Sequence, residues 1–112
     1  MTFSPATYQA QVDTLGNPIE PTANTGIAAG SSTTVVKGAP GRVCRFIITT
    51  AGSSSDNATI YDNATAGSGT ILGVIPGGTT LTGAQVNVGM TAVNGITVVN
   101  VASGPAFTIA YS

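Results

Sequence analysis

Apolar and polar residues alternate with a period of two along most of the chain after residue 31, which is the pattern of β-strands that bury one face. The clearest example is the segment 42–50, RVCRFIITT. One face of this segment would carry Cys44, Phe46 and Ile48. The opposite face would carry Val43, Arg45, Ile47 and Thr49. Because the first face is the more apolar, we expect it to point into the core.

Six other segments are short, rich in β-branched residues and bounded by Gly, Pro, Asn, Asp or Ser. They are 32–37, 58–62, 70–75, 84–89, 96–102 and 106–111. No segment has the 3.6-residue period of a helix. Strands spaced by roughly 8–12 residues are typical of sandwiches. The pattern therefore predicts an all-β fold, an antiparallel β-sandwich or jelly roll of about seven to eight short strands.

Two turns can be predicted from their residues. In NATIYDNATAGSGTILGVIPGG, residues 57–78, we expect two strands joined by a turn in which Asn and Asp side chains satisfy backbone N–H groups. The pair Asn94-Gly95 favours a two-residue type I′ hairpin, because that turn needs φ > 0 at both central residues.

The N-terminal segment differs from the rest of the chain. It contains Pro5, Pro18 and Pro21 and keeps neither period, so the sequence predicts an extended N-terminal arm (1–30) before a β-sandwich domain (31–112). A solvated tail is the alternative. The arm is favoured because it carries apolar side chains that a tail does not need. These are Phe3, Tyr8, Val12, Leu15 and Ile19.

The charge content argues against several classes of partner. Only 6% of the 112 residues are charged, with three Lys+Arg and four Asp+Glu. No basic stripe is available for nucleic acid or for an anionic membrane surface. No apolar run reaches the ~18 residues of a membrane span, and residues 1–5 lack the charged and apolar regions of a signal peptide. A net charge near zero gives little repulsion between copies.

The chain also offers little chemistry. It has no His and one Cys, which argues against Ser-His-Asp or Cys-His catalysis and against a structural zinc site. Cys44 is expected to be a small buried side chain. Asp56 and Asp62 lie at opposite ends of one predicted strand, about 20 Å apart, which is too far for a glycosidase pair. With Asn57 and Asn63 they could form a calcium loop, but the turn role above is favoured. We therefore expect no enzyme, metal or cofactor.

Three segments together resemble small β-rich structural proteins of tailed bacteriophages, of the head-decoration and capsid-fibre type. They are VVKGAPGRVCRFIITTAG, ATIYDNATAGSGTILGVIP and GITVVNVASGPAFTIAYS, within residues 33–112. The resemblance implies a virion protein on the outer capsid surface that binds the major capsid protein and forms a homotrimer. It brings no catalytic residue.

Stability considerations also favour an oligomer. About 80 residues with small side chains and no disulfide make a thin core, which association between copies can complete. We expect the five apolar arm residues to contact the capsid or a neighbouring subunit. Arg42 and Arg45 are further candidates, because such scarce cations tend to be paired or used, although both could simply be solvated.

The alternative function is a glycan-binding module of a tail fibre or adhesin. A sugar site needs exposed aromatic rings and amides. Tyr61 or Tyr111 together with Asn57 or Asn63 could supply them, whereas core or rim tyrosines are the simpler interpretation.

Overall fold

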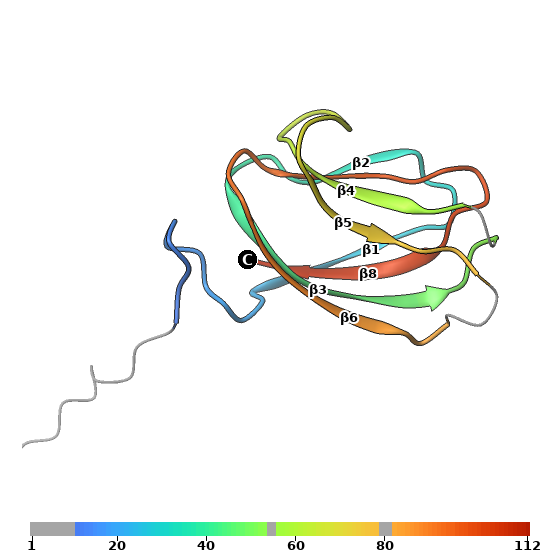
Figure 1. The fold of residues 1–112 in the computed structure, drawn as a ribbon, viewed down its shortest axis with the longest axis horizontal. Coiled ribbons are helices and arrows are strands. Elements are labelled where there is room, and N and C mark those ends of the chain that lie inside the picture. Colours follow the sequence, from blue (N-terminus) through green and yellow to red (C-terminus); the bar gives the residue numbers. More distant parts are fainter. Residues whose placement is uncertain (1–10, 54–55, 79–81) are drawn as a thin grey trace, which may run out of the picture.

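The computed structural model describes residues 11–53, 56–78 and 82–112, and their regular structure consists of eight β-strands (Figure 1). The strands are β1 (Ala23–Ile27), β2 (Thr33–Lys37), β3 (Gly41–Thr50), β4 (Ala58–Asp62), β5 (Ile71–Ile75), β6 (Gln85–Ala92), β7 (Ile96–Val99) and β8 (Ala106–Tyr111). The predicted all-β class is confirmed. Each of the seven predicted segments overlaps one of these strands, because alternating β-branched residues suit a half-buried pleated surface.

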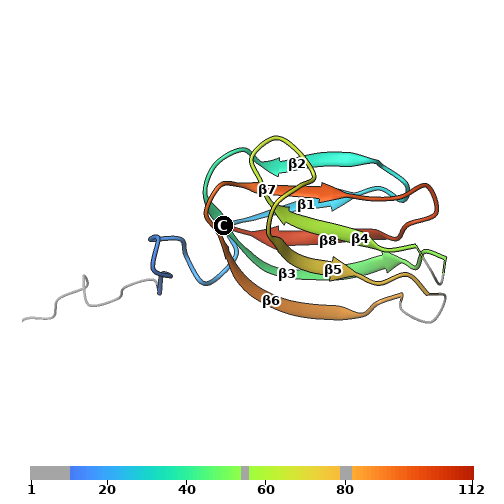
Figure 2. The same ribbon diagram turned by 45° about the horizontal axis from the view of Figure 1, so that its top comes forward.

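The strands form two four-stranded antiparallel sheets that face each other (Figure 2). One sheet has the order β1-β8-β3-β6 and the other the order β2-β7-β4-β5. Strand β1 pairs with β8, β2 with β7, β3 with β6 and β4 with β5. Each of the first four strands thus pairs with one of the last four, which makes a long two-stranded ribbon. Successive pairs along this ribbon belong alternately to the two sheets. This is the winding of a jelly roll.

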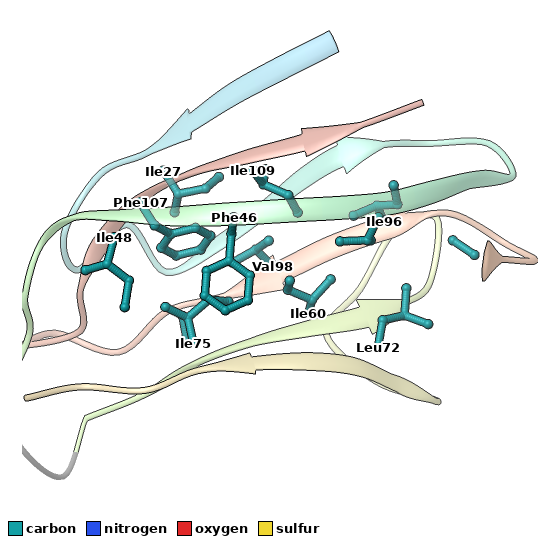
Figure 3. Close-up of a cluster of buried hydrophobic side chains, with 13 residues drawn as sticks. Ile27, Phe46, Ile48, Ile60, Leu72, Ile75, Ile96, Val98, Phe107 and Ile109 are labelled. Atoms are coloured by element: carbon teal, nitrogen blue, oxygen red, sulfur yellow. The ribbon is translucent and has the colours of Figure 1, made fainter. Parts of the chain in front are cut away.

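The core lies between the inner faces of the two sheets (Figure 3). Phe46 of β3 and Phe107 of β8 pack edge to face, with ring centroids 6.3 Å apart. Aliphatic side chains from both sheets surround these rings and are almost completely buried. They include Ile27, Ile48, Ile60, Leu72, Ile75, Ile96, Val98 and Ile109.

Strand β1 lies within the segment that the sequence analysis assigned to the arm. Residues 23–27, ANTGI, contain one large apolar side chain, Ile27, and so lack a recognisable period. Their pairing with β8 makes them a strand, and Ile27 is 3% exposed in the core. The sandwich therefore begins at about residue 23 rather than at residue 31.

A bulge in β3 changes which side chains enter the core. The register with both neighbouring strands shifts between Val43 and Arg45. Val43, which strict alternation placed on the outer face, is fully buried in the core cluster. Cys44 is buried as predicted, but its Sγ lies 3.3 Å from the carbonyl oxygen of Ile19 and it is not part of that cluster. The extra residue of a bulge breaks the two-residue period on which the prediction depends.

The predicted type I′ hairpin at Asn94-Gly95 is wrong. The two residues connect β6 of one sheet to β7 of the other, and neither has a positive φ. The Asp62 carboxylate holds this connection by accepting hydrogen bonds from the amides of Val93, Asn94 and Gly95, at 3.1, 2.7 and 3.3 Å. A carboxylate from a distant strand thus satisfies donors that a hairpin would satisfy locally.

Candidate interaction surfaces

The outer face of the β2-β7-β4-β5 sheet carries two adjacent rows of residues, each row crossing all four strands. The first row, in strand order, is Val35, Thr97, Tyr61 and Ile71. The second row is Thr33, Val99, Thr59 and Val74. All eight side chains are aliphatic, aromatic or hydroxylic, and we call this surface the apolar face.

Three aliphatic side chains of the apolar face are open to solvent. Val35 on one edge strand is 46% exposed, and on the other edge strand Ile71 and Val74 are 52% and 46% exposed. Neither row contains a charged residue. Strand β5, ILGVI, ends its sheet and has no charge or Pro to deter pairing with another strand.

The loop between β4 and β5 curves back over its own sheet (Figure 1) and contacts strand β7 on the apolar face. The buried Thr97 hydroxyl donates to the carbonyl oxygen of Asn63 at 2.7 Å. Gly67 packs so closely that an added Cβ would overlap the Cγ2 methyl of Val99. The Asn63 side chain holds the turn by accepting from the amides of Thr65 and Ala66, both at 2.9 Å. The predicted hairpin with an Asn-capped turn is therefore confirmed.

The described part of the predicted arm includes a tight turn at one end of the sandwich. Asp13 accepts hydrogen bonds from the amides of Leu15 and Asn17, and Gly16 has the positive φ that the turn requires. The turn is tied to β6 by the Thr91 hydroxyl, 3.0 Å from Asp13 Oδ2, and to β3 by Arg42, whose Nη1 lies 3.6 Å from the same oxygen.

This network sets the ionisation of Asp13. Burial alone would raise the pKa of Asp13, but the hydrogen bonds from Asn17, Leu15 and Thr91 outweigh it and lower the pKa. The opposite balance holds at the neighbouring Cys44, where burial raises the pKa of the thiol although the charge of Arg42 opposes the rise. Cys44 is thus kept as a protonated, weakly nucleophilic thiol.

The structure places the predicted contact residues in three settings. Val12 and Leu15 project from the turn and are 53% and 51% exposed. Ile19, Arg42 and Arg45 line one hollow beside β3 and β6. Phe3 and Tyr8 lie outside the described residues.

Arg42 and Arg45 have different roles in the fold. Arg42 is paired with Asp13, as expected of a scarce cation. Arg45 makes no ion pair with any described residue and lies on the outer face of the β1-β8-β3-β6 sheet, opposite Ala110 and Asn87.

Three of the residues considered for a sugar site, Tyr111, Asn57 and Asn63, make contacts within the fold. Tyr111 packs against the core, and its hydroxyl lies 3.2 Å from that of Thr25. Asn57 accepts a hydrogen bond from the Gly77 amide, and Asn63 is engaged in its own turn. These amides serve the backbone, which is their usual role at strand ends.

Asp62 likewise has a structural role. Burial alone would raise the pKa of Asp62, but the three amides of the β6–β7 connection outweigh it and lower the pKa. Among residues 11–53, 56–78 and 82–112, no group of three or more His, Cys, Asp or Glu side chains is placed to hold a metal ion. Within the same residues no helix is long and apolar enough to cross a membrane.

Val35, Ile71 and Val74 are not among the contact residues predicted from the sequence. They belong to strands that were predicted, but their exposure depends on which face of each strand meets the other sheet. Comparisons of the chain with models of protein families, with curated proteins and with solved structures found no match. The surfaces of the molecule are therefore the basis for proposing a function.

Proposed function

We propose that the protein is a structural component of a bacteriophage virion, located on the outer capsid surface, where it binds the major capsid protein as a homotrimer. The observation that carries the assembly is the apolar face, which is uncharged and exposes aliphatic side chains on both edge strands. The virion and the number three come from the resemblance of residues 33–112 to phage decoration proteins.

The exposed part of the apolar face suits contact with a second copy. Scattered single apolar side chains are ordinary on a protein surface, whereas grouped ones mark interaction sites. Ile71 and Val74 lie on the same outer face of one edge strand, opposite Tyr61 and Thr59. Burying them between copies removes apolar area from water without desolvating an ion.

Strand β5 adds a second favourable feature. An uncharged edge strand can pair through its backbone with a strand of another copy. Backbone pairing at the β5 edge would fix the orientation of the second copy, and burial of the apolar outer face would stabilise the contact. We assign subunit association to this edge.

The turn at residues 13–17 suits a different contact. It holds Val12 and Leu15 away from the body of the sandwich on a backbone anchored to β3 and β6. An apolar pair that is already ordered loses little conformational entropy on docking. We assign these two residues to the capsid contact.

Two measurements test the proposal. Light scattering at micromolar concentration and two salt levels should give three times the mass of the single chain, and this trimer should resist salt because the contact is apolar. Antibodies against the purified chain should label the surface of intact phage particles. A monomer at every concentration would refute the self-association, and absence of the chain from purified particles would refute the virion assignment.

The arm contact has its own test, in capsids to which the protein is added back. The double variant Val12→Asp, Leu15→Asp should remain folded and trimeric and should lose binding to capsids. Deleting the whole segment 1–30 would not serve, because it also removes β1 from the sheet. Undiminished binding of the double variant would exclude the turn as the capsid contact.

A further inference from the structure

The outer face of the β1-β8-β3-β6 sheet has an arrangement that the assembly proposed above does not use. One row across the four strands consists of Asn24, Ala110, Arg45 and Asn87. The next row consists of Gly26, Thr108, Ile47 and Gln85. We call this surface the polar face.

Arg45 is at the centre of the polar face, between two hollows. The first, of about 80 Å³, is bordered by Arg45 together with Asn24, Ile47, Gln85, Thr108 and Ala110. The second, of about 320 Å³, is bordered by Arg45, Asn87, Arg42, Ile19 and Glu20. The small side chain of Ala110, which lies opposite Arg45 on β8 and borders the first hollow, leaves room beside the guanidinium.

We infer that the polar face binds a carboxylated saccharide, with Arg45 binding the carboxylate and the surrounding side-chain amides binding the hydroxyls. A guanidinium presents parallel N–H donors that match the two oxygens of a carboxylate. Asn24, Gln85 and Asn87 each offer both a donor and an acceptor, and this suits hydroxyl groups, which also do both.

The charge of the polar face favours this ligand over other anions. The two rows contain one charged residue, Arg45. The larger hollow adds Arg42, which is paired with Asp13, and the Glu20 carboxylate, so Arg45 is the one cation at the site without an ion pair among the described residues. Nucleic acids and densely sulfated polymers are bound through several cations. A sugar acid carries one carboxylate among many hydroxyls per residue, which is the ratio that these rows offer.

The geometry also favours a saccharide over an acidic protein segment. An extended peptide pairs with the edge of a sheet, where backbone groups are free, whereas Arg45 lies on the inner strand β3. Protein contacts are centred on buried aromatic or aliphatic residues, and the one large apolar side chain in these two rows is Ile47.

The test is a titration of the isotope-labelled full chain with trigalacturonate, followed by amide chemical shifts. We expect saturable shifts grouped around Arg45, Asn87 and Gln85. The fully methyl-esterified trisaccharide keeps the ring hydroxyls and lacks the negative charge, so it should bind at least roughly tenfold more weakly, as loss of a charge-assisted hydrogen bond predicts.

Two variants with equal net charge separate a site from general attraction. Arg45→Gln should weaken trigalacturonate binding by roughly tenfold or more, while Lys37→Gln should leave binding unchanged. Both variants should keep the wild-type circular dichroism. Equal weakening by both, equal affinity for the ester, or no saturable shifts at millimolar trigalacturonate would each overturn the inference.

A poly-glutamate peptide tests whether the face binds the carboxylates of a protein and not those of a saccharide. We expect it to bind at least roughly tenfold more weakly than trigalacturonate, because it lacks the hydroxyls that the amides would bind. Tighter binding of the peptide would refute the saccharide and assign the face to an acidic protein. This inference does not depend on the virion proposal, since a monomer that binds trigalacturonate would refute the trimer alone.

Discussion

The outer faces of the two sheets differ in chemistry although each is built from four antiparallel strands. The apolar face exposes Val35, Ile71 and Val74 and has no charge in its two rows, whereas the polar face exposes Asn24, Gln85 and Asn87 around Arg45. The core does not depend on this difference, because its side chains come from the inner faces of the two sheets. The two proposals made above give the two faces different partners, an apolar protein surface and a hydrated polar ligand.

The difference is visible because the chain is so poor in charge. In most domains ionic side chains cover both faces of a sandwich, at about a quarter of all residues. Here hydroxyls, amides and aliphatic groups cover the surface, so one arginine or a pair of exposed aliphatic residues has a large influence on what each face can bind.

The largest effect is expected from charging the apolar face. The double variant Ile71→Asp, Val74→Asp should reduce the mass measured by light scattering to that of a monomer, because two desolvated carboxylates oppose the contact. The single variant Val101→Asp charges another exposed valine, 42% exposed in the β7–β8 loop, and should leave the mass unchanged. If the double variant is still a trimer, the contact between subunits does not involve Ile71 and Val74.

The second largest effect is expected from removing the Asp62 carboxylate, which links β4 to the β6–β7 connection. Asp62→Ala leaves the amides of Val93, Asn94 and Gly95 without their acceptor and should lower the free energy of unfolding by about 2–3 kcal/mol in urea titrations. Asp62→Asn keeps one acceptor oxygen and should lose less. Equal stability of the Ala variant and the wild type would show that water replaces the carboxylate.

Lowering the pH should reversibly remove part of the same free energy of unfolding. The pKa values of Asp13 and Asp62 are lowered by folding, so their stabilisation is present above the ordinary Asp value of 3.8 and is lost as the pH falls through the folded pKa values. Urea midpoints measured between neutral pH and about pH 3 should fall below about pH 4. The fall should be shallower in Asp62→Asn, and an unchanged slope would exclude Asp62 as its source.

A smaller effect is expected where the β4–β5 loop meets the apolar face. Gly67→Val places a side chain against the Cγ2 methyl of Val99 and should cost about 1–2 kcal/mol, as overpacking does. The loop should lift, and an apolar dye should bind more strongly to the variant. Ala66→Val, at the neighbouring exposed position, is the matched control and should change neither measurement.

Much of this fold can be predicted from sequence because its strands are local patterns. The Asn63 turn was predicted because an Asn side chain satisfies amides two and three positions ahead. Strand β1 was missed, since one large apolar side chain in ANTGI does not make a period. Asn94-Gly95 was misassigned because Asp62, which lies on a strand distant in the chain, supplies the acceptor that the local sequence does not contain.

The candidate surfaces were only partly predictable. The exposure of Val12 and Leu15 fits their predicted role in contact, which stays a prediction until capsid binding is measured. Arg45 was selected because cations are rare in the chain. Its amide neighbours could not be recognised, because Asn24 and Gln85 are far apart in the sequence and border the same hollow only once β1, β8, β3 and β6 form one sheet.

The sequence by itself determined that the chain is all-β, where seven of its strands lie, and that its surface is nearly free of charge. These properties depend on residue type and on spacing within a few positions. Only the tertiary structure decided that β1 pairs with β8 and β4 with β5 in a rolled ribbon, that a bulge turns Val43 inward, and that aliphatic side chains gather on one outer face and amides on the other. The physical reason is that strand pairing joins residues far apart in the chain, and each row of a face takes its members from four strands.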